Sequence, residues 1–331
     1  MQLSERGAYW LDVVIFAGIS VIMYEIGFLS LLYLVPLQVM TKKRGESALL
    51  FSSLLVLTAV LITALIHTRT MEEVQLKNVL IFLELVLPVM LIASLYVINR
   101  QFSQKWRGLY RLLGVTLAVG IVSIPIILIL KQNTRFTEYF RGQIAQVVKV
   151  FTESLFLQNG VYEEGVIRSL FNPDRLMQTI KAVFFRNYLF SFFLMLTLNW
   201  RIGVGIARRF FGGTVPVLSR FFLPSKYIWV FLISWAGILA DIFFGLNMAG
   251  YIVWNIGLIS LFLYGLQGIG IIRHMLERSN FGRGLQTFIT VMIVFLLIVP
   301  GLNILILLGI PIFGVSEVWI HYRKPKRSDQ T

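Results

Sequence analysis

The feature that most constrains this chain is its series of long apolar stretches, each near the length that crosses a lipid bilayer. A spanning helix needs about 20 mostly apolar residues. Six stretches meet this requirement: Ala48–Ile66, Val79–Ile98, Leu109–Leu130, Val183–Trp200, Tyr227–Leu246 and Gly250–Ile272. The chain is 57% hydrophobic and only 14% charged, so a water-soluble fold could not cover its apolar surface with polar side chains. The sequence therefore predicts an all-α, polytopic transmembrane helical bundle.

Two further apolar stretches are too long for a single crossing. Thr287–Ile320 would extend about 50 Å as one helix, against a hydrocarbon core of about 30 Å. Pro300-Gly301 interrupts it near the middle, which predicts two spans joined by a tight hairpin. Ala8–Gln38 leaves two alternatives open, namely one long tilted helix or a full span followed by a short re-entrant piece. We expect about nine crossings, in a range of about eight to ten.

The basic residues gather in alternate loops, although the whole chain carries a net charge of +14. In one set of loops and the C-terminal tail, 19 bases face only four acids, Glu46, Glu277, Glu317 and Asp329. Lysine and arginine mark the cytoplasmic loops of membrane proteins. This pattern predicts a multi-pass protein of the bacterial inner membrane with its C-terminus inside. We also expect the tail Arg323–Arg327 to attract anionic lipids, whereas no motif indicates binding of nucleic acid.

One long loop, Lys131–Ala182, is predicted on the opposite, extracytoplasmic side. Its apolar residues recur at helical spacing, and this stripe offers candidate partner-binding residues at Phe136, Phe140, Val147 and Phe151. After a break at residues 158–160, Asn172-Pro-Asp174 predicts the start of another helix. We expect amphipathic helices that lie on the outer leaflet or cap the bundle. The chain is thus one membrane domain in three parts: residues 1–130, 131–182 and 183–331.

Three acidic residues lie within the apolar stretches and are candidate ligand-binding residues: Glu25, Glu84 and Asp241. Ionisable groups are costly in hydrocarbon, so a functional role competes with a structural one for each. Glu84 precedes Pro88 by one turn, where a free backbone carbonyl could create a polar pocket. Glu25 lies near midplane in a single long helix but at a turn in the re-entrant alternative. For Asp241, the structural alternative is snorkelling to the outer interface.

Ser260, Tyr264 and Gln267 form a polar stripe on one predicted helix and are further candidate ligand-binding residues. Their spacing places them within about 60° on a helical wheel. Such a stripe must face protein or a cavity rather than lipid. Two readings stay open: hydrogen bonds between helices, or the wall of a ligand pocket.

Several classes of chemistry are not indicated. The chain has no cysteine and three histidines, which are far apart in sequence, so no metal site is predicted. Neither a phosphate-binding nucleotide loop nor a serine nucleophile elbow occurs. We therefore expect no cofactor, no catalytic residues and no ATPase activity in this chain.

The C-terminal half carries motifs that resemble a known family. Phe222-Leu223-Pro224 precedes a Trp-rich span, the next span runs from Asn255 to Arg273-His274, and the last ends in Trp319-Ile-His-Tyr-Arg-Lys324. With Tyr33-Leu-Val-Pro36 near the N-terminus, these motifs resemble the YybS-like family of predicted bacterial membrane proteins of unknown function. That family is distantly similar to the S-components of energy-coupling-factor transporters. The resemblance implies a bundle that binds a small molecule from outside and works with a separate ATPase module.

Two hypotheses follow from the sequence. In the first, the chain is a small-molecule binding or transport component resembling a transporter S-component. In the second, it is a non-catalytic scaffold or assembly partner of another membrane complex, and the long extracytoplasmic segment provides the surface. The ligand and the partner are not identifiable from the residues.

Overall fold

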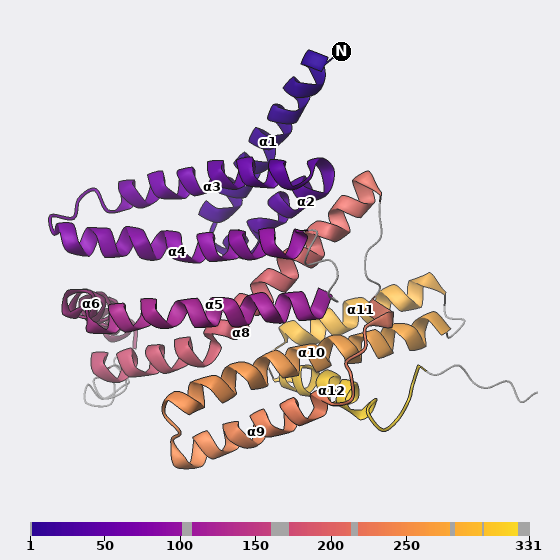
Figure 1. The fold of residues 1–331 in the computed structure, drawn as a ribbon. Helices are drawn as coiled ribbons and strands as arrows, with labels where there is room; N and C mark the ends of the chain where they lie inside the picture. Colours follow the sequence, from indigo (N-terminus) through magenta and orange to yellow (C-terminus); the bar gives the residue numbers. More distant parts are fainter. Residues whose placement is uncertain are drawn as a thin grey trace, which may run out of the picture. The chain divides into compact units, whose positions relative to one another are not determined.

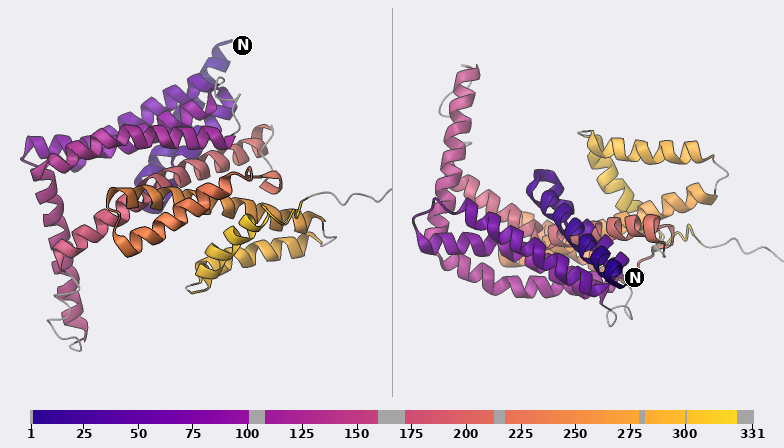
Figure 2. Two further views of the ribbon diagram at one scale, coloured as in Figure 1. Left: turned by 60° about the horizontal axis from the view of Figure 1, so that its bottom comes forward. Right: turned by 90° about the horizontal axis from the view of Figure 1, so that it is seen from above.

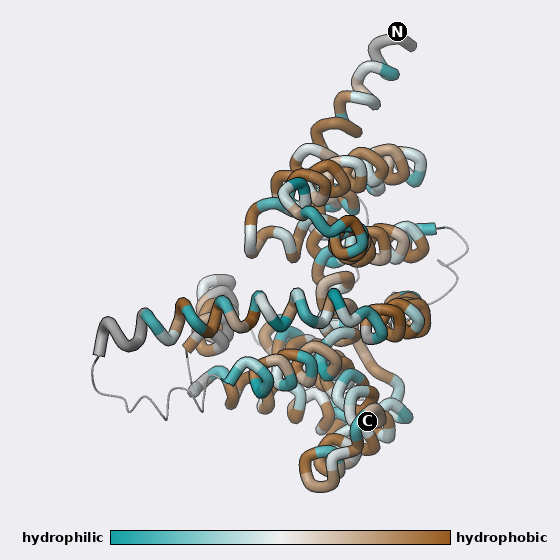
Figure 3. Tube along the Cα trace, turned by 90° about the vertical axis from the view of Figure 1, so that its left-hand side faces the viewer, coloured by the Kyte–Doolittle hydropathy of each residue, from teal (hydrophilic) through white to brown (hydrophobic). Residues whose placement is uncertain are grey.

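The computed structural model describes residues 2–100, 108–159, 172–212, 218–278, 282–299 and 301–323, and every regular element in these ranges is a helix. The all-α prediction is therefore confirmed. The chain divides into two compact units, unit 1 at Met1–Gly213 and unit 2 at Thr214–Thr331, which are described separately. Figure 1 shows the helices of both units, and apolar residues dominate most of them (Figure 3).

Unit 1 contains seven α-helices and one short 3-10 helix in its described part. The elements are α1 (Gln2–Glu25), η1 (Gly27–Leu32), α2 (Leu34–Arg44), α3 (Glu46–His67), α4 (Val74–Asn99), α5 (Gly108–Gln132), α6 (Thr134–Asn159) and α8 (Pro173–Phe211). The predicted spans 48–66, 79–98 and 109–130 lie inside α3, α4 and α5, and the predicted span 183–200 lies inside α8. Local hydropathy therefore located these four helices correctly.

The N-terminal apolar stretch is broken rather than continuous, so the alternative of one long helix is wrong. The break falls at Ile26, between α1 and η1. The eleven-residue α2 then runs back along α1. Near the start of α2, Ser20 Oγ of α1 donates a hydrogen bond to the carbonyl of Tyr33, and near its end Lys43 pairs with Asp12 of α1. All residues of α2 from Leu34 to Thr41 are buried. Helix α2 is thus a short internal helix packed against α1, α3, α4 and α8.

Two polar contacts fix α2 in this position. At its C-terminal end, Lys43 and Arg44 both pair with Asp12 of α1 at 2.7 Å. In its middle, Gln38 and Asn99 of α4 exchange two amide hydrogen bonds of 3.1 and 2.7 Å. Gly203 of α8 lies directly against Gln38, because a Cβ there would lie 2.5 Å from Cβ of Gln38. The buried amide pair and the close helix contact therefore hold α2, α4 and α8 together.

Helix α6 is the amphipathic helix predicted for the long loop, and it ends at Asn159, next to the predicted break. Figure 2 shows α6 projecting away from α4 and α5, and polar and apolar residues alternate along it (Figure 3). The next helix, α8, begins as predicted at Asn172-Pro-Asp174, where the Asn172 side chain accepts hydrogen bonds from the backbone amides of Asp174 and Arg175. Arg141 of α6 pairs with Asp174 at 2.7 Å.

Unit 2 is built around the long helix α10. Its described elements are η3 (Leu218–Arg220), α9 (Tyr227–Phe244), α10 (Met248–Arg278), α11 (Arg283–Ile298) and α12 (Leu302–Ser316). Helices α10 and α12 meet at their backbones: a Cβ at Gly268 would lie 2.1 Å from the Ile310 carbonyl oxygen, and a Cβ at Gly314 would lie 2.0 Å from the Tyr264 carbonyl oxygen. Glycine is therefore required at both positions.

The predicted C-terminal hairpin is present, with Gly301 at a positive φ between α11 and α12. These two helices have 16 and 15 residues, so each extends only about 22–24 Å. Within the described residues, seven helices are long and apolar enough to span a membrane: α1, α3, α4, α5, α8, α9 and α10. The structure thus has seven candidate spans among its described residues where nine crossings were expected, because α11 and α12, which were predicted as two spans, are shorter than a full crossing requires.

Candidate functional site

In unit 1, three helices bring together polar side chains that are distant in sequence. Tyr24 and Glu25 end α1, His67 ends α3, and Glu84 lies in α4. Nδ1 of His67 is 3.5 Å from Oε1 of Glu84, and Tyr24 lies within electrostatic range of both carboxylates. The ring of Tyr33 packs edge-on against Tyr24, with centroids 5.4 Å apart. We call Tyr24, Glu25, His67 and Glu84 the polar cluster.

The polar cluster remains accessible, which suits binding better than internal packing. The side chain of Glu84 is 27% exposed and that of His67 is 63% exposed, and Glu25 is exposed as well. Because Pro88 lacks an N–H, the backbone carbonyl of Glu84 loses its usual helical donor, which adds an acceptor beside the carboxylate. The cluster therefore presents two carboxylates and oxygen acceptors, a set suited to a cationic group.

The break after α1 positions Glu25, and sequence reasoning foresaw this only as one of two alternatives. In the structure Glu25 ends α1 at the turn into η1, as the re-entrant alternative implied. Neither Tyr24 nor His67 was singled out in the sequence. A signal existed for His67, which closes an apolar span, but its proximity to Glu84 depends on how α3 and α4 pair.

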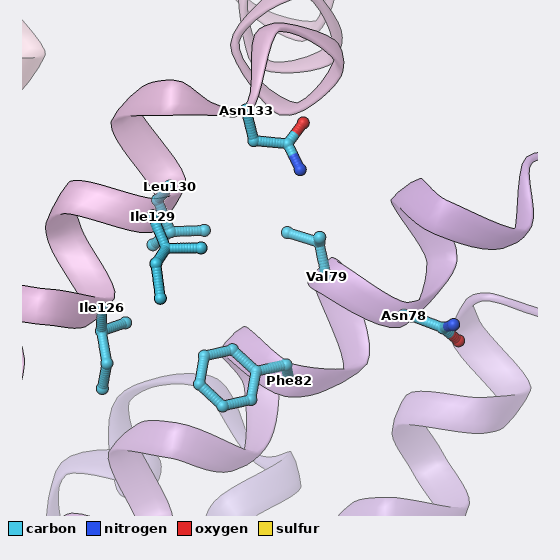
Figure 4. Close-up of a pocket in the computed structure, with 7 residues that line it drawn as sticks. All are labelled: Asn78, Val79, Phe82, Ile126, Ile129, Leu130 and Asn133. Atoms are coloured by element: carbon cyan, nitrogen blue, oxygen red, sulfur yellow. The ribbon is translucent and has the colours of Figure 1, made fainter.

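A separate apolar cavity of about 210 Å³ lies between α4 and α5 near the start of α6. Figure 4 shows Val79 and Phe82 on one side and Ile126 and Ile129 on the other, with Asn133 at one end. The Asn133 side chain also accepts a hydrogen bond from the Phe136 amide at the start of α6. The cavity is smaller than the 300–1,000 Å³ of ordinary ligand pockets. Since Phe82 and Glu84 are about 200° apart on the helix, the cavity is not part of the polar cluster.

In unit 2, the predicted polar stripe of α10 is buried by neighbouring protein. Gln267 is 1% exposed; its Oε1 accepts from the amide of Leu223 at 2.8 Å, and its Nε2 donates to the Gly314 carbonyl at 3.0 Å. Ser260 donates to the carbonyl of Gly257 in its own helix. The bond from Gln267 to Gly314 of α12 joins two helices, whereas the bond of Ser260 stays within α10.

Tyr264, the remaining residue of the stripe, is 1% exposed and packs edge-on against Phe231 of α9 with ring centroids 5.3 Å apart. Its hydroxyl has no hydrogen-bond partner in the described part of the chain. Tyr264 therefore lies at the α9–α10 contact, in a different unit from Glu25 and Glu84.

Asp241 is buried within unit 2, with an exposed fraction of 5%. Its Oδ1 accepts from the Leu246 amide and its Oδ2 accepts from Nε1 of Trp254, both at 2.9 Å. A Cβ at Gly250 would lie 2.2 Å from Oδ1 of Asp241. The carboxylate thus organises the turn between α9 and α10, where Gly245 and Asn247 have positive φ.

The predicted partner-binding stripe of α6 is covered in its first part and open in its second. Phe136 and Phe140 are half-buried and stack at 6.2 Å. Val147 is 68% exposed and Phe151 is 47% exposed. The second part of α6 therefore offers apolar side chains on the surface of unit 1.

A metal centre finds no support in the residues that the structure describes, since none of them form a group of three or more acidic or histidine side chains able to hold an ion.

One comparison with known proteins identifies a family for this chain. No curated protein and no solved structure matches the chain. Residues 78–311 match the family described as "Predicted membrane protein (DUF2232)". The match runs from α4 into α12 and includes Glu84, Asp241 and Gln267, while Glu25 and His67 precede it. Because the match covers well over half of the chain, the protein belongs to this family of predicted membrane proteins.

Proposed function

We propose that the protein is a small-molecule-binding component of the membrane and that the polar cluster binds the ligand. The observation that carries this proposal is the approach of His67, at the end of α3, to Glu84 of α4, with Nδ1 of His67 3.5 Å from Oε1 of Glu84. Apart from His67, no cationic side chain in the described residues pairs with Glu84. A carboxylate in such a setting is costly without a partner, and a bound cation would offset that cost.

The ligand class that fits this chemistry is an organic cation such as an amine. Two carboxylates supply charge, and the ring of Tyr24 supplies a face for a cation–π contact. A cofactor-free binding component also agrees with the expected absence of a nucleotide site in the sequence. Transport by such a component, as the sequence resemblance to the YybS-like family implies, would require a separate ATPase partner.

The test is ligand-dependent thermal stabilisation of the full chain in detergent, screened with amines, vitamins and lipid precursors. A ligand at 100 times its Kd stabilises the folded state by about 2.7 kcal/mol. We expect a cationic ligand to raise the Tm of the wild type, and Glu84→Gln and Glu25→Gln to lose this shift. Glu153→Gln, which removes an exposed acid of α6, serves as the control and should keep the ligand-induced rise in Tm.

The proposal fails if no cation in the screen raises the Tm, or if Glu84→Gln responds as the wild type does. A shift given only by neutral or anionic compounds would also contradict it.

A second candidate function, an assembly partner for another membrane complex, is favoured by the exposed side chains of α6. Val147 and Val150 are 68% and 62% exposed on a helix that projects from unit 1. In this case a membrane protein should co-purify with the chain in fixed stoichiometry. The double variant Val147→Asn, Val150→Asn should lose this co-purifying partner, whereas Gln146→Asn on the same helix should retain it. Purification as a lone chain in mild detergent would argue against this function.

A further inference from the structure

The apolar cavity between α4 and α5 is bounded by helices that polar contacts join at both ends. At the end away from the cavity, Nη1 of Arg111 in α5 donates to the Ile98 carbonyl of α4 at 2.8 Å. At the cavity end, Arg135 of α6 pairs with Glu73, which directly precedes α4. Between these contacts the lining side chains leave about 210 Å³ unfilled. The cavity is therefore part of a connected region of unit 1.

The lining of the cavity changes from polar to apolar along the two helices. Asn78 lies in the second turn of α4, and Asn133 lies between α5 and α6. The other lining residues are apolar and lie further from these ends of the two candidate spans: Val79, Phe82, Ile126, Ile129 and Leu130. A membrane lipid has the same order, with its polar headgroup at the bilayer surface and its hydrocarbon chains beneath.

The size and chemistry of the cavity suit a segment of a hydrocarbon chain. A bound water needs two to four polar partners, which the apolar part of the lining does not offer. An apolar cavity of about 150 Å³ stays dry and binds a molecule as large as benzene, whereas whole small-molecule ligands occupy about 300–1,000 Å³. An unfilled cavity also forfeits the dispersion contacts of its lining. Part of a long apolar chain therefore fits better than a complete compact ligand.

The cavity is continuous with the surface that these spans present to lipid. Phe82 is 48% exposed and Ile129 is 66% exposed, although both line the cavity. They belong to α4 and α5, which are long and apolar enough to cross a membrane, in a chain that belongs to a family of predicted membrane proteins. Hydrocarbon chains of the bilayer therefore meet the cavity where these two side chains are exposed.

We infer that this cavity binds part of one acyl chain of a membrane lipid. Figure 4 shows the Asn133 amide group at one end of the cavity, on the side of Val79. Its Oδ1 accepts from the Phe136 amide, so its Nδ2 is the group that donates to an ester oxygen of the bound lipid. The site is separate from the polar cluster, and its ligand is recognised by shape and apolar contact rather than by charge.

The experiment places the full chain in phosphatidylcholine nanodiscs that contain a phosphatidylcholine with a photoreactive diazirine in one acyl chain. Mass spectrometry of the peptides locates the labelled residues after irradiation. We expect Phe82 and Ile129 to be labelled more strongly than Ile124 and Leu128. These two controls are apolar residues at the same level of α5, 54% and 48% exposed, that do not line the cavity.

Two variants fill the cavity from different helices, namely Val79→Phe in α4 and Ile126→Phe in α5. Each should reduce the labelling of Phe82 and Ile129 to the level of the controls. Leu128→Phe adds the same ring outside the cavity and should leave the pattern unchanged. The Tm of each variant shows whether it is folded, and either filled variant suffices for the comparison.

Two results would overturn the inference. Equal labelling of lining and control residues in the wild type would show only the contact that any lipid-facing side chain makes, and it is also the result expected if a protein segment occupies the cavity. Unchanged labelling in a folded, filled variant would show that the labelled lipid lies outside the cavity.

Discussion

The buried amide pair between Gln38 and Asn99 gives the sharpest test of how unit 1 is held together. Gln38 is fully buried and Asn99 is 7% exposed. Replacing Gln38 with Met keeps its approximate volume but removes the two hydrogen bonds between the Gln38 and Asn99 amides, which should lower the free energy of unfolding by about 1–3 kcal/mol. Asn99→Leu should cost a similar amount for the same reason. The double variant removes both polar groups, so its cost should be smaller than the sum of the two.

The size of the expected coupling follows from the two reciprocal hydrogen bonds. Side-chain hydrogen bonds between membrane helices average about 0.6 kcal/mol each, so the coupling energy of the cycle should be about 1 kcal/mol. Unfolding by sodium dodecyl sulfate in mixed micelles measures the four free energies. Gln75→Met, at an exposed position of α4, serves as the control and should change stability by less than about 0.5 kcal/mol. If the costs of the two single variants simply add, the amide pair does not stabilise α2 as argued.

Three further predictions concern unit 2 and are measured by thermal unfolding of the full chain. Gly314→Ala should lower the Tm by several degrees because its Cβ would overlap the backbone of α10. Gly309→Ala, where the added Cβ meets open space, should leave the Tm unchanged. Equal effects of the two variants would contradict the close contact between α10 and α12. Asp241→Leu should destabilise by about 1–3 kcal/mol, since it removes the carboxylate that accepts from the Leu246 amide and the Trp254 indole, and a neutral result would show that the turn does not need the carboxylate. Arg323→Lys should fail to restore the stability lost in Arg323→Ala, because a lysine cannot pair bidentately with Glu317; full rescue would show that charge alone suffices.

The helices were largely predictable from the sequence because membrane insertion depends on local hydropathy. The predicted span 227–246 and the observed α9 begin at the same residue, and the predicted hairpin falls at Gly301. In contrast, the path of residues 8–38 could not be decided, because α2 is stabilised by tertiary contacts. Gln38 meets Asn99 across 61 positions of sequence, and no local pattern reveals such a pairing.

The sequence identified individual candidate site residues, but it could not show which of them lie in the same part of the structure. Glu25 and Glu84 both lie in unit 1, whereas Asp241 and Gln267 lie in unit 2. Both terminal polar atoms of the Asp241 and Gln267 side chains are hydrogen-bonded to protein. Arg323 was grouped with the basic tail, yet it pairs with Glu317, which is 3% exposed, and donates to the carbonyls of Ser219 and Phe221. A charge count cannot separate such a structural arginine from one that faces lipid.

The internal position of α2 has a consequence for how the protein is made. Helix α2 packs against α8 through contacts such as Gln38 with Gly203, but α8 leaves the ribosome roughly 165 residues later. At about 5–20 residues per second, this delay is on the order of 10–30 s. During that time α2 must wait in the membrane with the Gln38 amide only partly enclosed by α4. Biogenesis of unit 1 therefore contains a long-lived intermediate that completes its core only when the last helix of the unit arrives.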